Sequence, residues 1–411
     1  MAELFTVLAP SEAYRVLESH LPAEVQTERV PLVRALDRVL CEDLTSPVDL
    51  PDFPRSTMDG FAVRAADTYG ASEGLPAYLT VSGEVLMGAS AETPVRVSEA
   101  VRIATGGMLP AGADAVVMVE NTQAVDSATI EVVRPVAPGE NVLRVGEDIT
   151  RGVTVLPHGY VLRPQDLGGL AALGITEVEV ARRLRVAIVS GGDELVAPDQ
   201  QPGPGQIRDI NTSTLSALVE RAGHEPVPMG IVPDVYEELA AAARRALDTA
   251  DVVILSAGSS VSTRDMTAQA IRSLGEPGVL VHGVSLRPGK PTILAVADGK
   301  PVFGLPGNPV SCMVTFDLFV APTLARLSGQ MGAPPRRELR ARLAHNIPSA
   351  AGREDYVQVT VEPRADGNLW AVPVFGKSNL IYTLVRTDGM VKVELDQGGL
   401  REDDWVSVIL F

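Results

Sequence analysis

Three stretches of this chain decide its fold: RVAIVSGGDEL (185–195), DVVILSAGSS (251–260) and PVFGLPGNPV (301–310). Each begins with a continuous apolar run and ends in a glycine-bearing turn. Because the apolar runs have no polar face, we expect strands that helices bury on both sides. Segments of helical periodicity lie between and after them, at 212–222, 235–250 and 310–327. The pattern predicts a central parallel α/β sheet.

The flanking sequence predicts further domains, since one hydrophobic core rarely exceeds roughly 250 to 300 residues and the chain has 411. Ser11 can cap a helix over 12–20, and Pro31 can begin another that continues through Leu40. Short alternating runs between 78 and 145, and again after the Ala333–Pro335 linker, predict β domains. We expect a multidomain α/β plus β protein. Its domains would be a discontinuous helical and extended domain (1–47 and 140–180), a small β-rich domain (48–139), a central α/β domain (181–330) and a C-terminal β-barrel-like domain (336–411).

Composition and charge narrow the classes of partner. The formal net charge of −17, with no basic run, argues against nucleic acid. The chain shows neither a signal-peptide pattern nor a long apolar run, so we expect a cytoplasmic protein with no membrane partner. Two cysteines, Cys41 and Cys312, fit a reducing compartment. An acidic protein that binds an anion must gather its few cations in one place.

The glycine-bearing turns after the three apolar runs predict a binding crevice. In open α/β sheets, ligands bind beyond the carboxyl ends of the strands, where backbone N–H groups and helix N-termini meet anions. Asn308 as N-cap and Pro309 as first helical residue place Ser311 in the positive first turn of a helix. Any one of these turns alone is more simply explained as an ordinary loop. Three together favour a site.

Carboxylates lie on or near the same turns and predict a magnesium ion beside a bound phosphate, because Mg²⁺ takes oxygen ligands and bridges to phosphate oxygens. The candidates are Asp193, Glu194, Asp209, Asp234 and Asp265. The alternative is structural, since Asp209 and Asp234 each precede a predicted helix and could cap it. The residues alone leave both possibilities open.

The cationic candidates are Arg287 and Lys290 in LRPGKP (286–291), where two prolines and a glycine fix a tight turn. Rigid presentation suits capture of an anion, although an exposed turn with two solvated bases is an equal alternative. Two upstream loops, 54–60 and 104–110, are dense in small and hydroxyl residues, and a turn role for Asp59 ranks ahead of a functional one there.

Other chemistries find little support in the sequence. The five histidines have no HExxH or Cys/His spacing, so a zinc site is not expected. Cys312 could be a nucleophile in the first turn of its helix, but Phe316 and Val320 continue its face as an apolar stripe, which favours core packing. The GxSxG, GxxxxGK[ST] and helix-opening GxGxxG patterns are missing, which argues against hydrolase, NTPase and dinucleotide sites.

Seven motifs in one order give the chain a resemblance that spans nearly its whole length. They are PRSTMDGFAV (54–63), ATGGMLP (104–110), GEDI (146–149), GGDEL (191–195), IRDIN (207–211), RPGKP (287–291) and GLPGNPVS (304–311). Taken together they resemble the molybdopterin molybdenumtransferase family, also called the MoeA family, which is related to the E domains of gephyrin and plant Cnx proteins. Each motif is weak by itself, whereas their shared order is specific.

The resemblance implies an activity, a cofactor and an assembly. It implies insertion of molybdate into adenylylated molybdopterin, with release of AMP and formation of molybdenum cofactor, assisted by Mg²⁺. It implies a molybdopterin-binding-like α/β domain, a discontinuous dimerisation domain, and an elongated homodimer that could meet the molybdopterin adenylyltransferase. Two other classes stay open: the adenylyltransferase itself, and a non-catalytic molybdopterin-binding scaffold.

The resemblance also assigns roles to particular residues. It implies that magnesium and the adenylyl phosphates are bound by Asp193, Glu194, Asp234 and Asp265. Of these, Glu194, Asp234 and Asp265 would be metal ligands, and Glu194 and Asp265 would also be catalytic. It implies that the molybdate tetraoxyanion is bound by Arg287, Lys290, Ser311, Arg353 and Ser378, and that further substrate contacts are made by Asp209, Pro306 and Asn308. Further catalytic positions are Asp59, Thr105 and Asp148, which match second-domain and hinge-side positions and would face the partner subunit.

The chain departs from the family pattern at three places. The loop Ala257–Asp265 retains Ser260 and Asp265 but loses two glycines. Arg287 replaces a lysine, which keeps the charge but exchanges a compact ammonium for a planar fork. Glycines near Ser378 become FGKSN (375–379), so that Lys377 could add a charge there.

Overall fold

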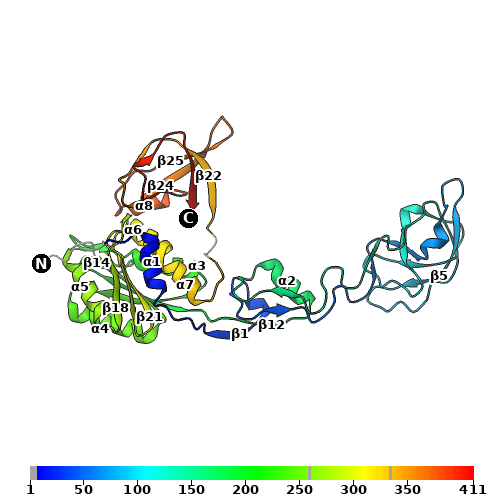
Figure 1. Cartoon of the computed structure of the whole chain (residues 1–411), viewed down its shortest axis with the longest axis horizontal. Coiled ribbons are helices and arrows are strands. Elements are labelled where there is room, and N and C mark those ends of the chain that lie inside the picture. Colours follow the sequence, from blue (N-terminus) through cyan, green and yellow to red (C-terminus); the bar gives the residue numbers. More distant parts are fainter. Residues whose placement is uncertain (1–6, 258–260, 333–335) are drawn as a thin grey trace. The chain divides into compact units, whose positions relative to one another are not determined.

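A six-stranded sheet forms the centre of the computed structural model, which describes residues 7–257, 261–332 and 336–411. Its order is β16-β13-β17-β21-β20-β18; β16, β13, β17 and β21 are parallel, and β20 is antiparallel to both of its neighbours, β21 and β18. Figure 1 labels β21 and β18 of this sheet. The bounds are β13 (Arg185–Gly191), β16 (Glu225–Val232), β17 (Val252–Ala257), β18 (Pro277–His282), β20 (Ile293–Ala297) and β21 (Lys300–Pro306). The predicted α/β sheet is confirmed.

Helices cover both faces of this sheet, as the unbroken apolar strands predicted. On β13, Val186 and Ile188 pack into one core with α1, α3, α6 and α7, whereas Ala187 and Val189 pack into a second core with α4 and α5. These helices are α1 (Pro10–Glu18), α3 (Asn211–Arg221), α4 (Tyr236–Thr249), α5 (Val261–Arg272), α6 (Pro309–Thr315) and α7 (Ala321–Leu327). The sheet is therefore buried on both sides.

The helical stretch Pro309–Leu327 is the core helix of this domain. A π-helical turn, Phe316–Val320, joins α6 to α7 and buries Phe316 and Phe319 almost completely. By length and composition alone this stretch could cross a membrane, but 67% of its apolar window is buried inside the protein. Its hydrophobicity is accounted for by packing on the sheet.

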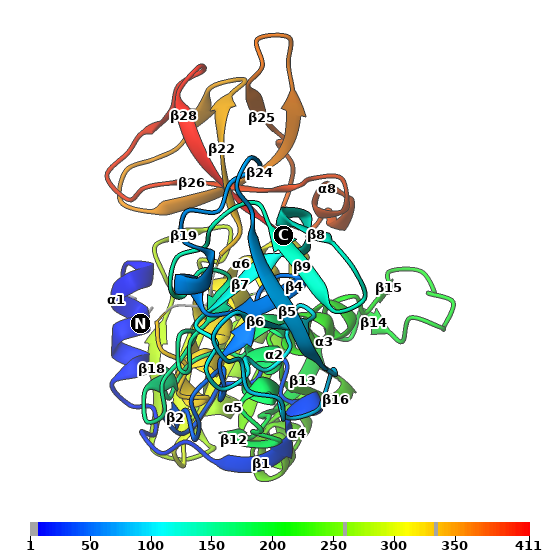
Figure 2. The same ribbon diagram turned by 90° about the vertical axis from the view of Figure 1, so that its right-hand side faces the viewer.

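The C-terminal region forms a closed five-stranded barrel, as expected. The strands pair in the order β24-β25-β22-β28-β26, and β26 pairs back with β24 to close the ring (Figure 2). The bounds are β22 (Glu338–Leu343), β24 (Glu354–Pro363), β25 (Leu369–Pro373), β26 (Gly389–Val393) and β28 (Trp405–Leu410), with β23 (Ile347–Pro348), β27 (Gly399–Leu400) and α8 (Ile381–Val385) alongside. The short strand β19 (Leu286–Arg287) pairs with β24 and so links the barrel to the α/β domain.

By its contacts, the chain divides into two compact units, residues 1–41, 159–163 and 177–411 in one and 42–158 and 164–176 in the other. The second unit holds a sheet of order β7-β4-β6-β5-β9-β8, which fits the short strands expected there. Its elements are β2 (Leu44–Thr45), β3 (Arg55–Ser56), β4 (Gly60–Val63), β5 (Ala77–Val85), β6 (Glu99–Ile103), β7 (Ala115–Met118), β8 (Thr122–Ala124), β9 (Thr129–Val132), β10 (Val142–Leu143), β11 (Thr154–Leu156) and α2 (Pro164–Ala172). The finer four-domain division, with its linker 333–335 outside the described residues, stays a prediction.

The N-terminal segment corrects two expectations. The helix expected from Pro31 to Leu40 is wrong: β1 (Thr27–Pro31) pairs with β12 (Glu177–Ala181), and only the 3-10 turn Leu32–Arg34 is helical. Pairing of Leu40 with Val180, which is distant in the same chain, outweighs the local helix signal. The first helix begins at Pro10 with Ala9 as N-cap, so Ser11 is not the cap.

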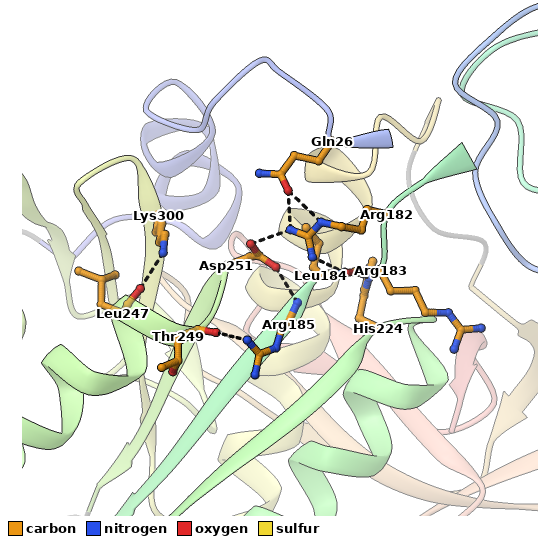
Figure 3. Close-up of polar contacts among 10 residues, drawn as sticks. All are labelled: Gln26, Arg182, Arg183, Leu184, Arg185, His224, Leu247, Thr249, Asp251 and Lys300. Carbon is orange, nitrogen blue, oxygen red and sulfur yellow. Dashed lines mark hydrogen bonds and ion pairs between the residues drawn. The ribbon is translucent and has the colours of Figure 1, made fainter. Parts of the chain in front are cut away.

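A polar cluster fixes the entry of the chain into the central sheet (Figure 3). Asp251 accepts from Arg182 Nη2 at 2.8 Å and from the Arg185 backbone N–H at 2.7 Å, and Gln26 Oε1 accepts from the same Arg182. Beside it, His224 Nδ1 accepts from the Leu184 N–H at 3.2 Å. Burial lowers the pKa of His224 to about 4, so this imidazole is neutral at physiological pH.

Candidate functional site

A cavity of about 550 Å³ opens where the carboxyl end of β21, the 287–291 turn and the start of α6 meet the barrel strand β24 and the 374–378 loop. Six residues predicted from the sequence as substrate contacts line it: Arg287, Lys290, Pro306, Asn308, Ser311 and Ser378. They come from three separate segments of the chain. The structure thus brings together most of the predicted anion site, with Lys377 as an added cation in the wall.

The 287–291 turn is held rigidly, which decides how its two cations are presented. Gly289 has φ +123°, and a Cβ there would meet Thr315 Cγ2 at 2.7 Å and Leu286 Cδ2 at 2.8 Å. The turn closes through the Val284 N–H, which donates to Lys290 O at 2.9 Å, and the Thr292 hydroxyl, which donates to Gly289 O at 2.7 Å. Rigid presentation of both bases is what anion capture requires.

The start of α6 holds Ser378 in place. Asn308 is the N-cap residue and Pro309 the first helical residue, as expected. The Asn308 side chain does not cap the helix, however, but donates from Nδ2 to Ser378 Oγ at 3.0 Å. The Val310 N–H donates to the Ser378 carbonyl at 3.2 Å. Ser378, a residue of the barrel region, is thereby held next to the N-terminus of α6.

Arg353 is absent from the lining of this cavity among the described residues, although the sequence suggested it as an oxyanion contact. Its guanidinium binds Asp355, which does line the cavity. Sequence reasoning missed Asp355. A signal was available, because Glu354 and Asp355 begin the β-type run EDYVQVTV (354–361), and two carboxylates in one buried strand need partners.

Three predicted acidic residues lie at the neighbouring carboxyl ends of β13 and β16. Asp193 Oδ1 accepts from the Asp234 N–H at 3.0 Å, and the Gly192 N–H donates to Val232 O at 3.1 Å. The Glu194 carboxylate lies over Gly192, where an added Cβ would meet Oε2 at 2.6 Å. The two turns therefore present carboxylates along one edge of the sheet.

Asp209 takes the structural role that the sequence left open. The N-cap residue of α3 is Ile210, but Asp209 accepts from the Thr212 N–H at 3.2 Å and from the Thr212 hydroxyl at 2.6 Å, and so satisfies a backbone donor in the first turn of α3. The neighbouring Asn211, also missed as a site residue, donates from Nδ2 to Ser256 Oγ at 2.9 Å and to Gly307 O at 2.8 Å. It ties the carboxyl end of β17 to the turn after β21. A substrate contact by Asp209 stays a prediction.

The magnesium site stays a prediction as well. Within residues 7–257, 261–332 and 336–411, no three His, Cys, Asp or Glu side chains gather closely enough to hold a metal ion. Asp265 is exposed on α5, and Ser260 lies outside the described residues. Mg²⁺ often binds through one or two carboxylates, several waters and substrate phosphates rather than an all-protein cage. Glu194 and Asp234 are suited to that mode by their oxygen donors.

The second compact unit holds the other predicted catalytic residues. Asp59 Oδ1 accepts from Thr105 N at 2.7 Å and from the Thr105 hydroxyl at 2.9 Å, and these hydrogen bonds lower the pKa of the Asp59 carboxyl. Asp59 therefore has a structural role, because these hydrogen bonds hold its loop against the loop that contains Thr105. Asp148 lines a second cavity of about 500 Å³ with Arg55 and Glu147.

Cys312 is part of the core rather than a nucleophile. Its thiol is buried, and burial raises its pKa to about 12, so the thiolate is essentially unpopulated at neutral pH. The preference for core packing is confirmed.

Fold and site together define a class: a multidomain protein with a largely parallel α/β sheet, a C-terminal barrel, and a cavity between them whose lining includes Arg287, Lys290 and Lys377. Three family models match successive parts of the chain. Residues 8–174 match the MoeA N-terminal region (domain I and II), residues 187–326 the "Probable molybdopterin binding domain", and residues 340–411 the MoeA C-terminal region (domain IV).

Whole-chain similarities agree. The molybdopterin molybdenumtransferase of Haemophilus influenzae is 34% identical over 403 residues, 98% of each chain, and that of Bacillus subtilis is 34% identical over 415 residues, covering 100% of this chain and 95% of its own. The crystal structure of a molybdopterin biosynthesis MoeA protein from Pyrococcus horikoshii superposes with a TM-score of 0.83 at 38% identity, covering 98% of this chain and 99% of that chain. This chain belongs to the MoeA family of molybdenum cofactor biosynthesis proteins.

Proposed function

We propose that this protein is a molybdopterin molybdenumtransferase, which inserts molybdate into adenylylated molybdopterin and releases AMP. The observation that carries the proposal is the cavity beside α6, in which Arg287, Lys290 and Lys377 meet within a chain of net charge −17. So dense a group of cations in an acidic protein suits a doubly charged oxyanion. The relatives named molybdenumtransferases support the same activity.

Catalysis in this cavity is chiefly a matter of positioning. Arg287 and Lys290 stand on a fixed turn, and Ser378 is fixed by Asn308, so molybdate would be held at a defined place before the dithiolene arrives. Ordered reactants avoid much of the entropic cost of a bimolecular step. Preorganised donors also stabilise charge that develops on oxygen during the exchange of oxo groups for sulfur.

The carboxylates at the ends of β13 and β16 are proposed to hold magnesium, through Glu194 and Asp234, with Asp265 from α5. Their oxygen-only donor set fits a hard cation. When bound, Mg²⁺ would neutralise and polarise the adenylyl phosphate. Asp193 positions the turn by accepting from the Asp234 N–H.

We further propose a cytoplasmic homodimer. The residues with predicted catalytic roles divide between the two compact units, with Asp59, Thr105 and Asp148 in one and the cavity beside α6 in the other. A partner subunit could supply the missing set. The adenylyltransferase that makes the substrate is the expected delivery partner.

The test is conversion of purified adenylylated molybdopterin by this protein with Mg²⁺, with and without molybdate, alongside Asp265→Asn. Molybdate-dependent release of AMP and formation of active cofactor, lost in the variant, is the expected result. ATP-dependent adenylylation would instead identify an adenylyltransferase. Tight pterin binding without turnover would identify a scaffold.

A further inference from the structure

A buried carboxylate lies in the wall of the cation-lined cavity, where a negative charge ought to repel the ligand. The Asp355 side chain is only 3% exposed. No role for it follows from the sequence. Burying a carboxylate costs several kcal/mol unless cations and hydrogen bonds compensate it, so its partners show what it does.

Asp355 binds two guanidinium groups at once. Arg353 Nε approaches Asp355 Oδ1 at 2.8 Å and Arg353 Nη2 approaches Oδ2 at 3.2 Å, which is the bidentate arrangement. Arg287 Nη1 lies 3.6 Å from the same Oδ2. Both Asp355 oxygens are therefore used, and one of them faces two arginines.

The backbone fixes this arrangement. Arg287 and Asp355 are direct partners in the parallel ladder of β19 and β24, so the register of that ladder sets the distance between the two side chains. The Glu354 N–H donates to Ser285 O at 2.9 Å at the same junction. An arginine that is otherwise 63% exposed is thus tethered beside the cavity rather than free to sample many rotamers.

On the basis of the function proposed above, we propose that Asp355 is a positioning residue for the oxyanion: it holds Arg287, which lines the cavity, in the orientation in which its remaining N–H groups can bind molybdate, while Arg353 compensates the buried charge of Asp355. Asp355 makes no contact with the anion in this account. It acts through the guanidinium group of Arg287, and the bidentate contact from Arg353 fixes the carboxylate that holds Arg287.

A purely electrostatic role predicts the opposite sign. If Asp355 were only a nearby negative charge, Asp355→Asn would remove a repulsion and tighten the binding of molybdate. If Asp355 orients Arg287, the same change weakens binding, because a neutral amide cannot hold the guanidinium group through a charge-assisted contact. The direction of the change therefore decides between the two roles.

Glu354 is the matched control. It is the preceding residue on β24, it is also buried, and it also pairs with a cation, Lys392, at 3.1 Å. The Tyr356 hydroxyl lies 3.3 Å from its carboxylate. Glu354→Gln thus removes a buried, paired carboxylate from the same strand without touching Arg287 or Arg353.

The experiment is calorimetric titration of the full-length protein with molybdate alone, followed by steady-state kinetics with varied molybdate. Asp355→Asn is expected to raise the molybdate dissociation constant and KM by about tenfold, the scale at which outer-shell partners act, with the KM for the pterin unchanged. Glu354→Gln is expected to leave molybdate binding as in the wild type. Unchanged or tighter binding by Asp355→Asn would overturn the inference.

Asp355→Glu keeps the test open if the Asn variant does not fold. It retains the charge but displaces the carboxylate by one methylene, so weaker molybdate binding is expected. A pure charge effect predicts no change in molybdate binding. If the wild type binds molybdate but turns over no substrate, the proposed function fails while the positioning role is still measured. If the wild type turns over and both Asp355 variants bind normally, the positioning role alone fails.

Discussion

Gly289→Ala tests whether the rigid turn 287–291 sets the affinity of the site for an anion. Gly289 has φ +123°, where an L-residue costs about 1 to 3 kcal/mol. The new methyl group would also lie 2.7 Å from Thr315 Cγ2 and 2.8 Å from Leu286 Cδ2, and such overpacking costs about 1 to 3 kcal/mol more. The sum is a destabilisation of about 2 to 6 kcal/mol.

Gly299→Ala is the matched control for this change. Gly299 lies between β20 and β21 of the same domain, at φ +78°, and an added Cβ would meet nothing within 4 Å. Its cost should be the backbone term alone, about 1 to 2 kcal/mol. Comparison of the two variants isolates the contact of the turn with α6 and with Leu286.

The assay is urea unfolding of both variants, together with the molybdate KM. Gly289→Ala should lower the free energy of unfolding by more than Gly299→Ala does, and it alone should raise the molybdate KM, because relief of the clash moves Arg287 and Lys290. Equal stability of the two variants, with equal KM values, would refute the claim that this turn is held by packing.

Three further outcomes follow from particular residues. The pKa of His224 is about 4 in the folded protein and returns to its ordinary value of 6.5 on unfolding, so the unfolded protein binds more protons as the pH falls. The free energy of unfolding should therefore drop by roughly 3 kcal/mol between pH 6.5 and 4. In urea unfolding, His224→Gln should lose less of its free energy of unfolding over this pH range than the wild type does. Iodoacetamide should leave Cys312 unmodified in the native protein at pH 8 and alkylate it after denaturation, as read by peptide mass spectrometry. Lys290→Ala should raise the molybdate KM about tenfold or more with little change in the free energy of unfolding, because Lys290 lines the cavity and its charge attracts the anion. An unchanged KM would show that Lys290 does not bind molybdate.

The central sheet could be predicted from local pattern because its strands have no polar face. Val186 to Val189 alternate between two cores, and an unbroken apolar run has no other stable environment in a protein of this kind. Asn308 and Pro309 likewise carried a local signal for the start of α6. The N-terminal segment did not, because Leu40 is held by pairing with Val180, a partner far away in the chain.

Several residues that line the candidate cavity could be predicted from the sequence, but the residues that hold them in place could not. Arg287 and Lys290 could be selected from the sequence because they are two cations on one short turn. The roles of Asp355 and Asn211 depend instead on which distant groups the fold brings next to them. Asn308 illustrates the same limit, since its position was clear from sequence but the partner of its side chain, Ser378, was not. Local chemistry identifies the residues, and tertiary structure assigns their partners.

The most direct test of the account is to locate molybdate itself, by anomalous diffraction at the molybdenum edge from crystals grown with molybdate. We expect one molybdenum peak in the cavity beside α6, within reach of Arg287, Lys290 and Ser378. A peak at another place, or no peak at concentrations that saturate turnover, would contradict the assignment of this cavity as the site of molybdate transfer.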